Sequence, residues 1–140
     1  MIPTLLDTDI LSWYLRGNPN VVEACTAYRK QYNTLYFSII TYYEILSGLR
    51  FRNAWRQEEH FLKMAEQCTI LPLTSEACKI AAEAYAQLRN AGTPVDDIDL
   101  LIAGIALSNN QVISTHNVRH FEKIPNLEIN DWLNPTMPEQ

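Results

Sequence analysis

The feature that most constrains the fold is an alternation of short apolar runs with longer amphipathic segments along nearly the whole chain. The short runs are rich in leucine, β-branched and aromatic residues, which is typical of strands. Strands are predicted at residues 2–6, 34–38, 69–73, 111–114 and 127–129. Helices are predicted at residues 9–16, 21–32, 42–51, 54–67, 75–91 and 97–107. Strands that alternate with helices form a parallel sheet covered on both faces, so we predict a three-layer α/β/α fold.

Acidic side chains stand where several of these strands give way to helices. They form three short clusters: Asp7 and Asp9; Glu44; and Asp96, Asp97 and Asp99. Only 19% of the residues are charged, and an unpaired carboxylate is costly to bury within apolar segments. Hard cations such as Mg²⁺ or Mn²⁺ prefer carboxylate oxygen. The clusters therefore favour a metal-dependent enzyme.

Topology gives a reason for acids far apart in the sequence to meet. In parallel sheets, ligands bind outside the carboxyl ends of the strands, at the point where the strand order reverses. Asp7 ends the first predicted strand and Glu44 follows the second. Asp99 opens a helix that leads into the fourth strand, and Asn117 follows that strand. We expect these four residues to converge on one edge of the sheet, with Asp97 as the alternative to Asp99.

Each acid also has a simpler interpretation as a helix-terminal residue. Asp7 and Asp9 suit the first turn of a helix, where negative charge is favourable. Thr41 and Glu44 have the spacing of a capping box. The acids after Pro94 fit a helix start as well. Asp9 is expected to point away from Asp7, because it lies two residues further on.

Bulk properties narrow the class of protein. A chain of 140 residues fits one domain, predicted at residues 1–133, followed by a loose tail at 134–140. Three cysteines without a CxxC motif indicate free thiols in the cytoplasm. Neither a signal peptide nor an apolar run of the ~18 residues needed to span a membrane is found.

The net charge of −5 does not exclude a nucleic acid. Six of the sixteen acids lie in the clusters, which leaves ten acids against eleven lysines and arginines. If metal neutralises the clusters, the remaining surface is not acidic. Arg50, Arg52 and Arg56 then form a local basic stretch that permits a phosphate-backbone ligand.

Four ordered segments give a more specific indication: LLDTDIL, SIITYYEILSGL, GTPVDDIDLLIAG and ISTHNVRHFEKIPNLEINDW. Together they resemble a PIN-domain ribonuclease of the VapC toxin type over nearly the whole chain. The resemblance implies a five-stranded parallel sheet and cleavage of RNA that depends on Mg²⁺ or Mn²⁺. It also implies a VapB-like antitoxin as partner and a homodimer.

The resemblance assigns roles by position. The family's three acids fall on Asp7, Glu44 and Asp99, which would bind the metal, and its final site position falls on Asn117. Asp9 stands where an asparagine is more usual, and His116 with Asn117 replaces the more common paired asparagines or an aspartate.

Two rival interpretations stay open at this point. The first is a phosphatase of the haloacid dehalogenase type, because Asp7-Thr8-Asp9 follows a strand, although that family needs a catalytic lysine and a larger chain. The second is a degenerate PIN module that binds RNA or a protein without cleavage.

Overall fold

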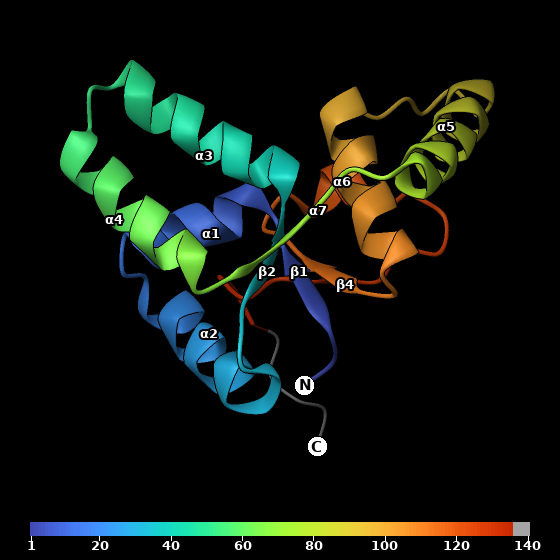
Figure 1. Cartoon of the computed structure of the whole chain (residues 1–140). Coiled ribbons are helices and arrows are strands. Elements are labelled where there is room, and N and C mark those ends of the chain that lie inside the picture. Colours follow the sequence, from blue (N-terminus) through green and yellow to red (C-terminus); the bar gives the residue numbers. More distant parts are fainter. Residues whose placement is uncertain (136–140) are drawn as a thin grey trace.

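A five-stranded parallel sheet forms the centre of the molecule, which the computed structural model describes over residues 1–135 (Figure 1). The strands, in chain order, are β1 (Thr4–Leu6), β2 (Tyr36–Ser38), β3 (Thr69–Leu71), β4 (Val112–Ser114) and β5 (Ile129–Asn130). Their order across the sheet is β3-β2-β1-β4-β5, and all neighbours are parallel. The order reverses at β1, which places the end of this strand at a switch point.

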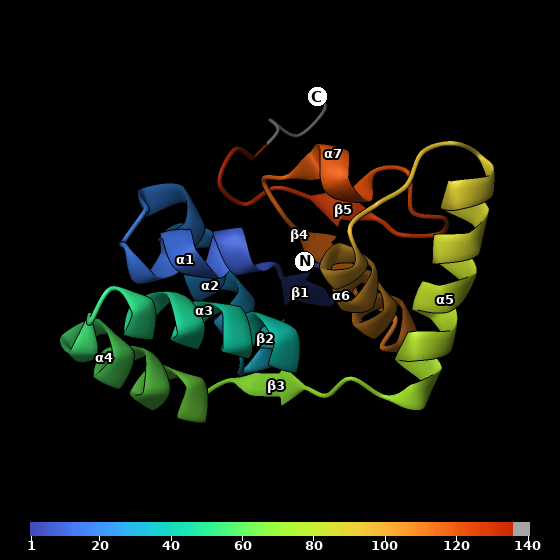
Figure 2. The ribbon, with the colours of Figure 1, turned by 90° about the horizontal axis from the view of Figure 1, so that it is seen from above.

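Helices cover both faces of the sheet, which confirms the three-layer prediction. One layer holds α1 (Thr8–Leu15), α2 (Pro19–Tyr32), α3 (Ile39–Phe51) and α4 (Trp55–Glu66). The other holds α5 (Ser75–Asn90) and α6 (Asp97–Ser108), and Figure 2 shows the sheet between the two groups. A short helix, α7 (Val118–Phe121), follows β4.

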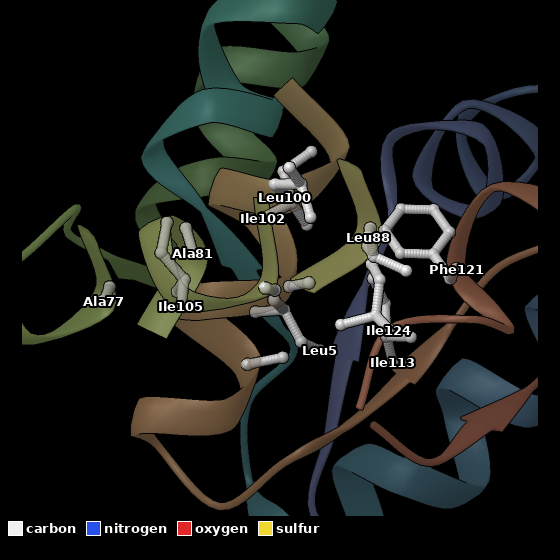
Figure 3. Packing of buried hydrophobic residues seen from close by; sticks show 13 residues of the cluster. Leu5, Ala77, Ala81, Leu88, Leu100, Ile102, Ile105, Ile113, Phe121 and Ile124 are labelled. Atoms are coloured by element: carbon white, nitrogen blue, oxygen red, sulfur yellow. The ribbon is translucent and has the colours of Figure 1, made fainter. Parts of the chain in front are cut away.

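Alternation along β1 divides the core into two parts. Successive side chains of a strand point to opposite faces, so Leu5 packs against α5 and α6 while Leu6 packs against α1 to α4. Figure 3 shows the first part, in which Leu5 lies beside Ile105 and Ile113. Both leucines are fully buried, and this fixes the register of the strand that carries Asp7.

The predicted elements are confirmed, with shifted ends that have local causes. The predicted strand at residues 2–6 begins only at Thr4, after Pro3, and the one at 69–73 ends before Pro72. Proline lacks the backbone N–H that a central strand such as β1 requires. β5 begins at Ile129, after a turn at Asn126, where φ is +67°. The sequence did not predict α7.

Two further expectations concern regions away from the sheet. No helix within residues 1–135 is both long and apolar enough to cross a membrane. The tail predicted to be loose, residues 134–140, lies largely outside the described residues, which end at 135.

Candidate active site

Asp7 is held at the end of the central strand. Its backbone N–H donates to the Ser114 carbonyl of β4 at 2.9 Å, which extends the pairing of β1 with β4 by one residue. Its Oδ2 accepts a hydrogen bond of 2.8 Å from Thr115 Oγ1. The side chain is only 5% exposed. Asp7 occupies the N-cap position of α1, but its side chain makes no capping bond, so the interpretation as a cap fails.

The environment of Asp7 disfavours its negative charge. Burial, followed by the nearby charge of Asp9, raises the pKa of Asp7 from 3.8 to about 7. Hydrogen bonds from Thr115 and from the Thr8 N–H act in the opposite direction, and the charge of Asp99 raises the pKa further. A buried carboxylate with acidic neighbours is stabilised when a cation binds beside it.

Glu44 reaches the same place from α3. Its Oε1 accepts a hydrogen bond of 2.6 Å from Thr8 Oγ1. The Thr8 hydroxyl also lies 3.0 Å from Thr41 Oγ1, and because its single proton goes to Glu44, Thr41 donates to Thr8. The capping-box interpretation of Glu44 is wrong. Ser38 caps the helix through the Thr41 N–H, so α3 begins at Ile39 and Glu44 lies beyond its first turn.

Asp99 lies in the first turn of α6, where it faces His120. His120 Nδ1 is 3.0 Å from Asp99 Oδ2. Burial raises the pKa of Asp99, the hydrogen bond and charge of His120 lower it, and the charges of Asp96 and Glu44 raise it. Asp96 is the N-cap of α6 and accepts a hydrogen bond from the Ile98 N–H. Asp97 is exposed, so the structure favours Asp99 over Asp97.

Asp9 belongs to this cluster, contrary to the expectation that it points away. Its Oδ2 accepts a 3.0 Å hydrogen bond from the His116 N–H, and its Oδ1 accepts one of 2.7 Å from the Ile10 N–H. Burial raises the pKa of Asp9, although these hydrogen bonds oppose the shift. The reason is that α1 begins directly after Asp7, which turns Asp9 back toward the end of β4.

Asn117 lies at the edge of the cluster. Its backbone N–H donates to Thr115 Oγ1 at 3.1 Å, so two hydrogen bonds connect it to Asp7. It occupies the N-cap position of α7, but its side chain makes no capping bond there. The side chain of Asn117 is exposed.

The donor set suits a divalent cation. Asp7, Glu44 and Asp99 each use one carboxylate oxygen in a side-chain hydrogen bond, and the second oxygen has no side-chain partner within residues 1–135. Among residues 1–135, no lysine or arginine forms an ion pair with these acids or with Asp9. Within the same residues, no three His, Cys, Asp or Glu side chains are already grouped around one point as ligands. The charge and chemistry of the residues therefore fit a cation.

Sequence reasoning missed the residues that hold the acids. These are Thr8, Thr115 and His120, each of which contacts one of the three predicted ligands. Thr115 had a detectable signal, because it follows β4 as Asp7 follows β1. Thr8 and His120 had none, since their partners lie 36 and 21 positions away.

Comparison with known proteins agrees with the observed fold. Over 129 residues the chain is 29% identical to Ribonuclease VapC1 of Haemophilus influenzae (strain R2866), covering 91% of this chain and 96% of the relative. It is 30% identical over 138 residues to the tRNA(fMet)-specific endonuclease VapC of Salmonella typhimurium, covering 94% and 99%. The crystal structure of DNA-bound VapBC from Salmonella typhimurium superposes with a TM-score of 0.83 at 28% identity, covering 94% of this chain and 99% of that one.

The match to a family model locates the site within a known domain. Residues 4–127 match the PIN domain, and this range contains β1 to β4 and every acid of the cluster. Because the match covers most of the chain and the observed fold agrees with it, the chain belongs to the PIN domain family.

Proposed function

We propose that this protein is an endoribonuclease that cleaves RNA phosphodiester bonds with Mg²⁺ or Mn²⁺ as cofactor. One observation carries the proposal: four acids from three distant segments lie near one another at one edge of the sheet, and within residues 1–135 no lysine or arginine pairs with any of them. Relatives that are named ribonuclease and endonuclease support RNA as the substrate.

The chain's own residues have distinct roles in this reaction. Asp7 and Asp99 would hold the cation, and Glu44 would bind it or orient the attacking water. A bound divalent ion activates water and stabilises the charge that develops on the phosphate. Thr115, Thr8 and His120 fix the carboxylates by the hydrogen bonds described above, which reduces the reorganisation that catalysis requires. Asn117 would stand at the rim of the site.

The partners are proposed from the same relationships. The Salmonella structure is a VapBC complex, and we infer that a VapB-like antitoxin neutralises this chain too, which makes it the toxin of such a pair. We also propose a homodimer, for which Tyr43, Phe51 and Trp55 offer apolar surface because each is more than two-thirds exposed. An RNA substrate would place the activity in the cytoplasm.

A second candidate function is binding without cleavage. It is favoured by the observation that no three ligand-type side chains within residues 1–135 already surround one point. A degenerate PIN module would then bind RNA or a protein through the same face. The two candidates differ in whether Asp7 is needed for metal affinity.

Cleavage of a labelled RNA by three variants separates these functions. Asp7→Asn and Asp99→Asn should each lower the rate by about 100-fold or more, because each removes a charge that holds the ion. Asp97→Asn is the matched control, since it removes the same charge two positions from Asp99 but at an exposed site. It should cleave like the parent.

Two results would contradict the proposal. The first is unchanged cleavage in folded Asp7→Asn, with folding checked by circular dichroism. The second is an equal loss in Asp97→Asn, which would point to net charge rather than to the site. Calorimetric titration with Mn²⁺ addresses the alternative: a parent chain that binds Mn²⁺ no better than Asp7→Asn is a binding module.

A further inference from the structure

A pocket of about 720 Å³ opens beside the acid cluster, between α1, α3 and α4. Glu44 forms part of its wall, so the pocket is continuous with the candidate active site. Its volume falls within the range of sites that hold small molecules or single ligand groups. Neither the metal ligands nor the residues that hold them account for this space.

Three arginines give the pocket positive charge. Arg16 follows α1, Arg52 follows α3, and Arg56 belongs to α4. Within the described residues none of the three forms an ion pair with an aspartate or glutamate. Arg50 differs, because its Nε is 3.0 Å from Glu58 Oε1 and it does not line this pocket. The Arg16 guanidinium donates to Ser12 and lies 4.0 Å from the Trp13 ring. Arg52 and Arg56 are therefore the guanidinium groups that the pocket offers to an anion.

Apolar side chains form much of the remaining wall, beside the polar residues Ser12, Gln57 and His60. Leu15, Ile45 and Leu49 line it, and the last two lie on the core-facing side of α3, next to the face that carries Glu44. Gly48 lies one turn after Glu44 and leaves space where a side chain would stand. A Cβ at Gly48 would be 3.4 Å from Arg52 Nη1. Guanidinium groups beside an apolar wall match a nucleotide, which joins a phosphate to a flat apolar base.

We propose that this pocket binds one unpaired nucleotide of the RNA, next to the phosphate that lies at the acid cluster. Arg52 and Arg56 would contact its phosphate, and Ile45 and Leu49 its sugar or base. A base held in a duplex is stacked and cannot enter, so the pocket selects single-stranded RNA. This inference rests on the proposed function, because the acids beside the pocket are where a phosphodiester must lie.

Binding of a fluorescein-labelled, mixed-sequence RNA 12-mer, followed by fluorescence anisotropy, tests the proposal. All chains carry Asp7→Asn, so that the probe stays intact whether or not the protein cleaves RNA. Arg52→Ala and Arg56→Ala should each weaken binding about threefold or more. Each should also reduce the slope of log affinity against log salt by about 0.7, the value for one phosphate contact on a single strand.

Two further variants distinguish binding in the pocket from a general effect of positive surface charge. Arg50→Ala removes the same charge from α3 outside the pocket and should change neither affinity nor slope. Gly48→Leu fills the pocket without changing the net charge, and it should weaken binding. Equal losses in Arg50→Ala and Arg52→Ala, or full affinity in Gly48→Leu, would overturn the proposal.

The rival occupant of the pocket is an acidic protein segment, and a labelled peptide of five Glu-Leu repeats is the probe for it. If Arg52→Ala and Gly48→Leu weaken binding of the peptide but not of the RNA, the pocket is a protein-docking site and the proposal is overturned. Cleavage by the chain without Asp7→Asn is measured separately. If that chain leaves RNA intact while the pocket variants still bind RNA less well, the proposed function fails and the pocket proposal stands.

Discussion

Each candidate metal ligand is held by a hydroxyl or ring donor from another part of the chain. Thr8 is one of these donors: it accepts from Thr41 and donates to Glu44 at 2.6 Å. Thr8 immediately follows Asp7, so one short segment positions two of the acids. Thr8 of α1 therefore helps to fix the position of the Glu44 carboxylate of α3.

Replacement of Thr8 by valine keeps the shape of the side chain and removes its hydroxyl. We expect Thr8→Val to lower kcat for RNA cleavage by about 10- to 100-fold, the usual effect of losing a partner that orients a metal ligand. The KM should change little, since Thr8 does not line the pocket beside Glu44. Steady-state kinetics measures both constants.

Serine provides the control for this prediction. Thr8→Ser retains the hydroxyl and should keep most of the activity. If Thr8→Ser loses as much as Thr8→Val, the methyl group and not the hydrogen bond matters. A Thr8→Val variant as active as the parent would show that Glu44 needs no support from Thr8.

At this scale the sequence indicated the acids but not their partners. Asp7, Glu44 and Asp99 could be identified because unpaired acids inside apolar segments carry a cost that implies a role. Their hydrogen bonds could not be predicted, because these bonds join side chains 21 to 108 positions apart. The predicted direction of the Asp9 side chain was wrong, because that direction depends on where α1 begins.

Helices α5 and α6 approach each other closely at Gly104. A Cβ at this position would be 2.4 Å from the Ala77 carbonyl oxygen, a distance that requires the backbone to move. Ala81 lies on the same side, so the contact depends on small residues in both helices. This contact holds α6, which carries Asp99, against α5.

We therefore expect Gly104→Ala to lower the free energy of unfolding by about 1–3 kcal/mol, the usual effect of forcing extra volume into a packed core. Alanine normally favours a helix over glycine by up to ~1 kcal/mol, so the loss would run against helix propensity. Urea unfolding monitored by circular dichroism gives the value.

The same substitution in α3 is the matched control. A Cβ at Gly48 would meet only Arg52 Nη1 at 3.4 Å, an ordinary contact. Gly48→Ala should leave stability unchanged or raise it by up to ~1 kcal/mol. If both substitutions change stability alike, close packing at Gly104 is not the cause.

Elements were easier to predict than their ends. The alternation of strands and helices was predictable because apolar periodicity is local. The start of α3 was misplaced because Ser38, itself a strand residue, acts as the N-cap. α7 was missed because four residues carry too little pattern.

At the scale of the whole molecule, burial of the Asp7 carboxyl group lowers the stability of the folded state when that group is charged. The pKa of Asp7 rises from 3.8 to about 7, so between these pH values the folded state binds more protons than the unfolded state. Stability should therefore fall as the pH rises from about 4 to about 7. A bound cation would reverse this effect by neutralising the carboxylate.

Asp7→Asn tests this directly, because asparagine resembles the neutral carboxyl group. In EDTA the variant should be as stable as the parent near pH 4 and more stable above pH 7, by up to a few kcal/mol. With Mn²⁺ at about 100 times its dissociation constant, the parent alone should gain about 2.7 kcal/mol. Urea unfolding at pH 4.5 and 8.5 measures these differences. Parallel pH profiles for the two chains would contradict the prediction.

The pairing of β1 with the much later strand β4 has a consequence for folding during translation. Asp7 is synthesised 108 positions before Thr115, the residue that holds it. β1 has no neighbour on the β4 side until that late segment has emerged. A nascent chain therefore lacks a complete centre until the segment that carries β4 and Thr115 has been made. The proposed nuclease activity can begin only after that segment has folded onto β1.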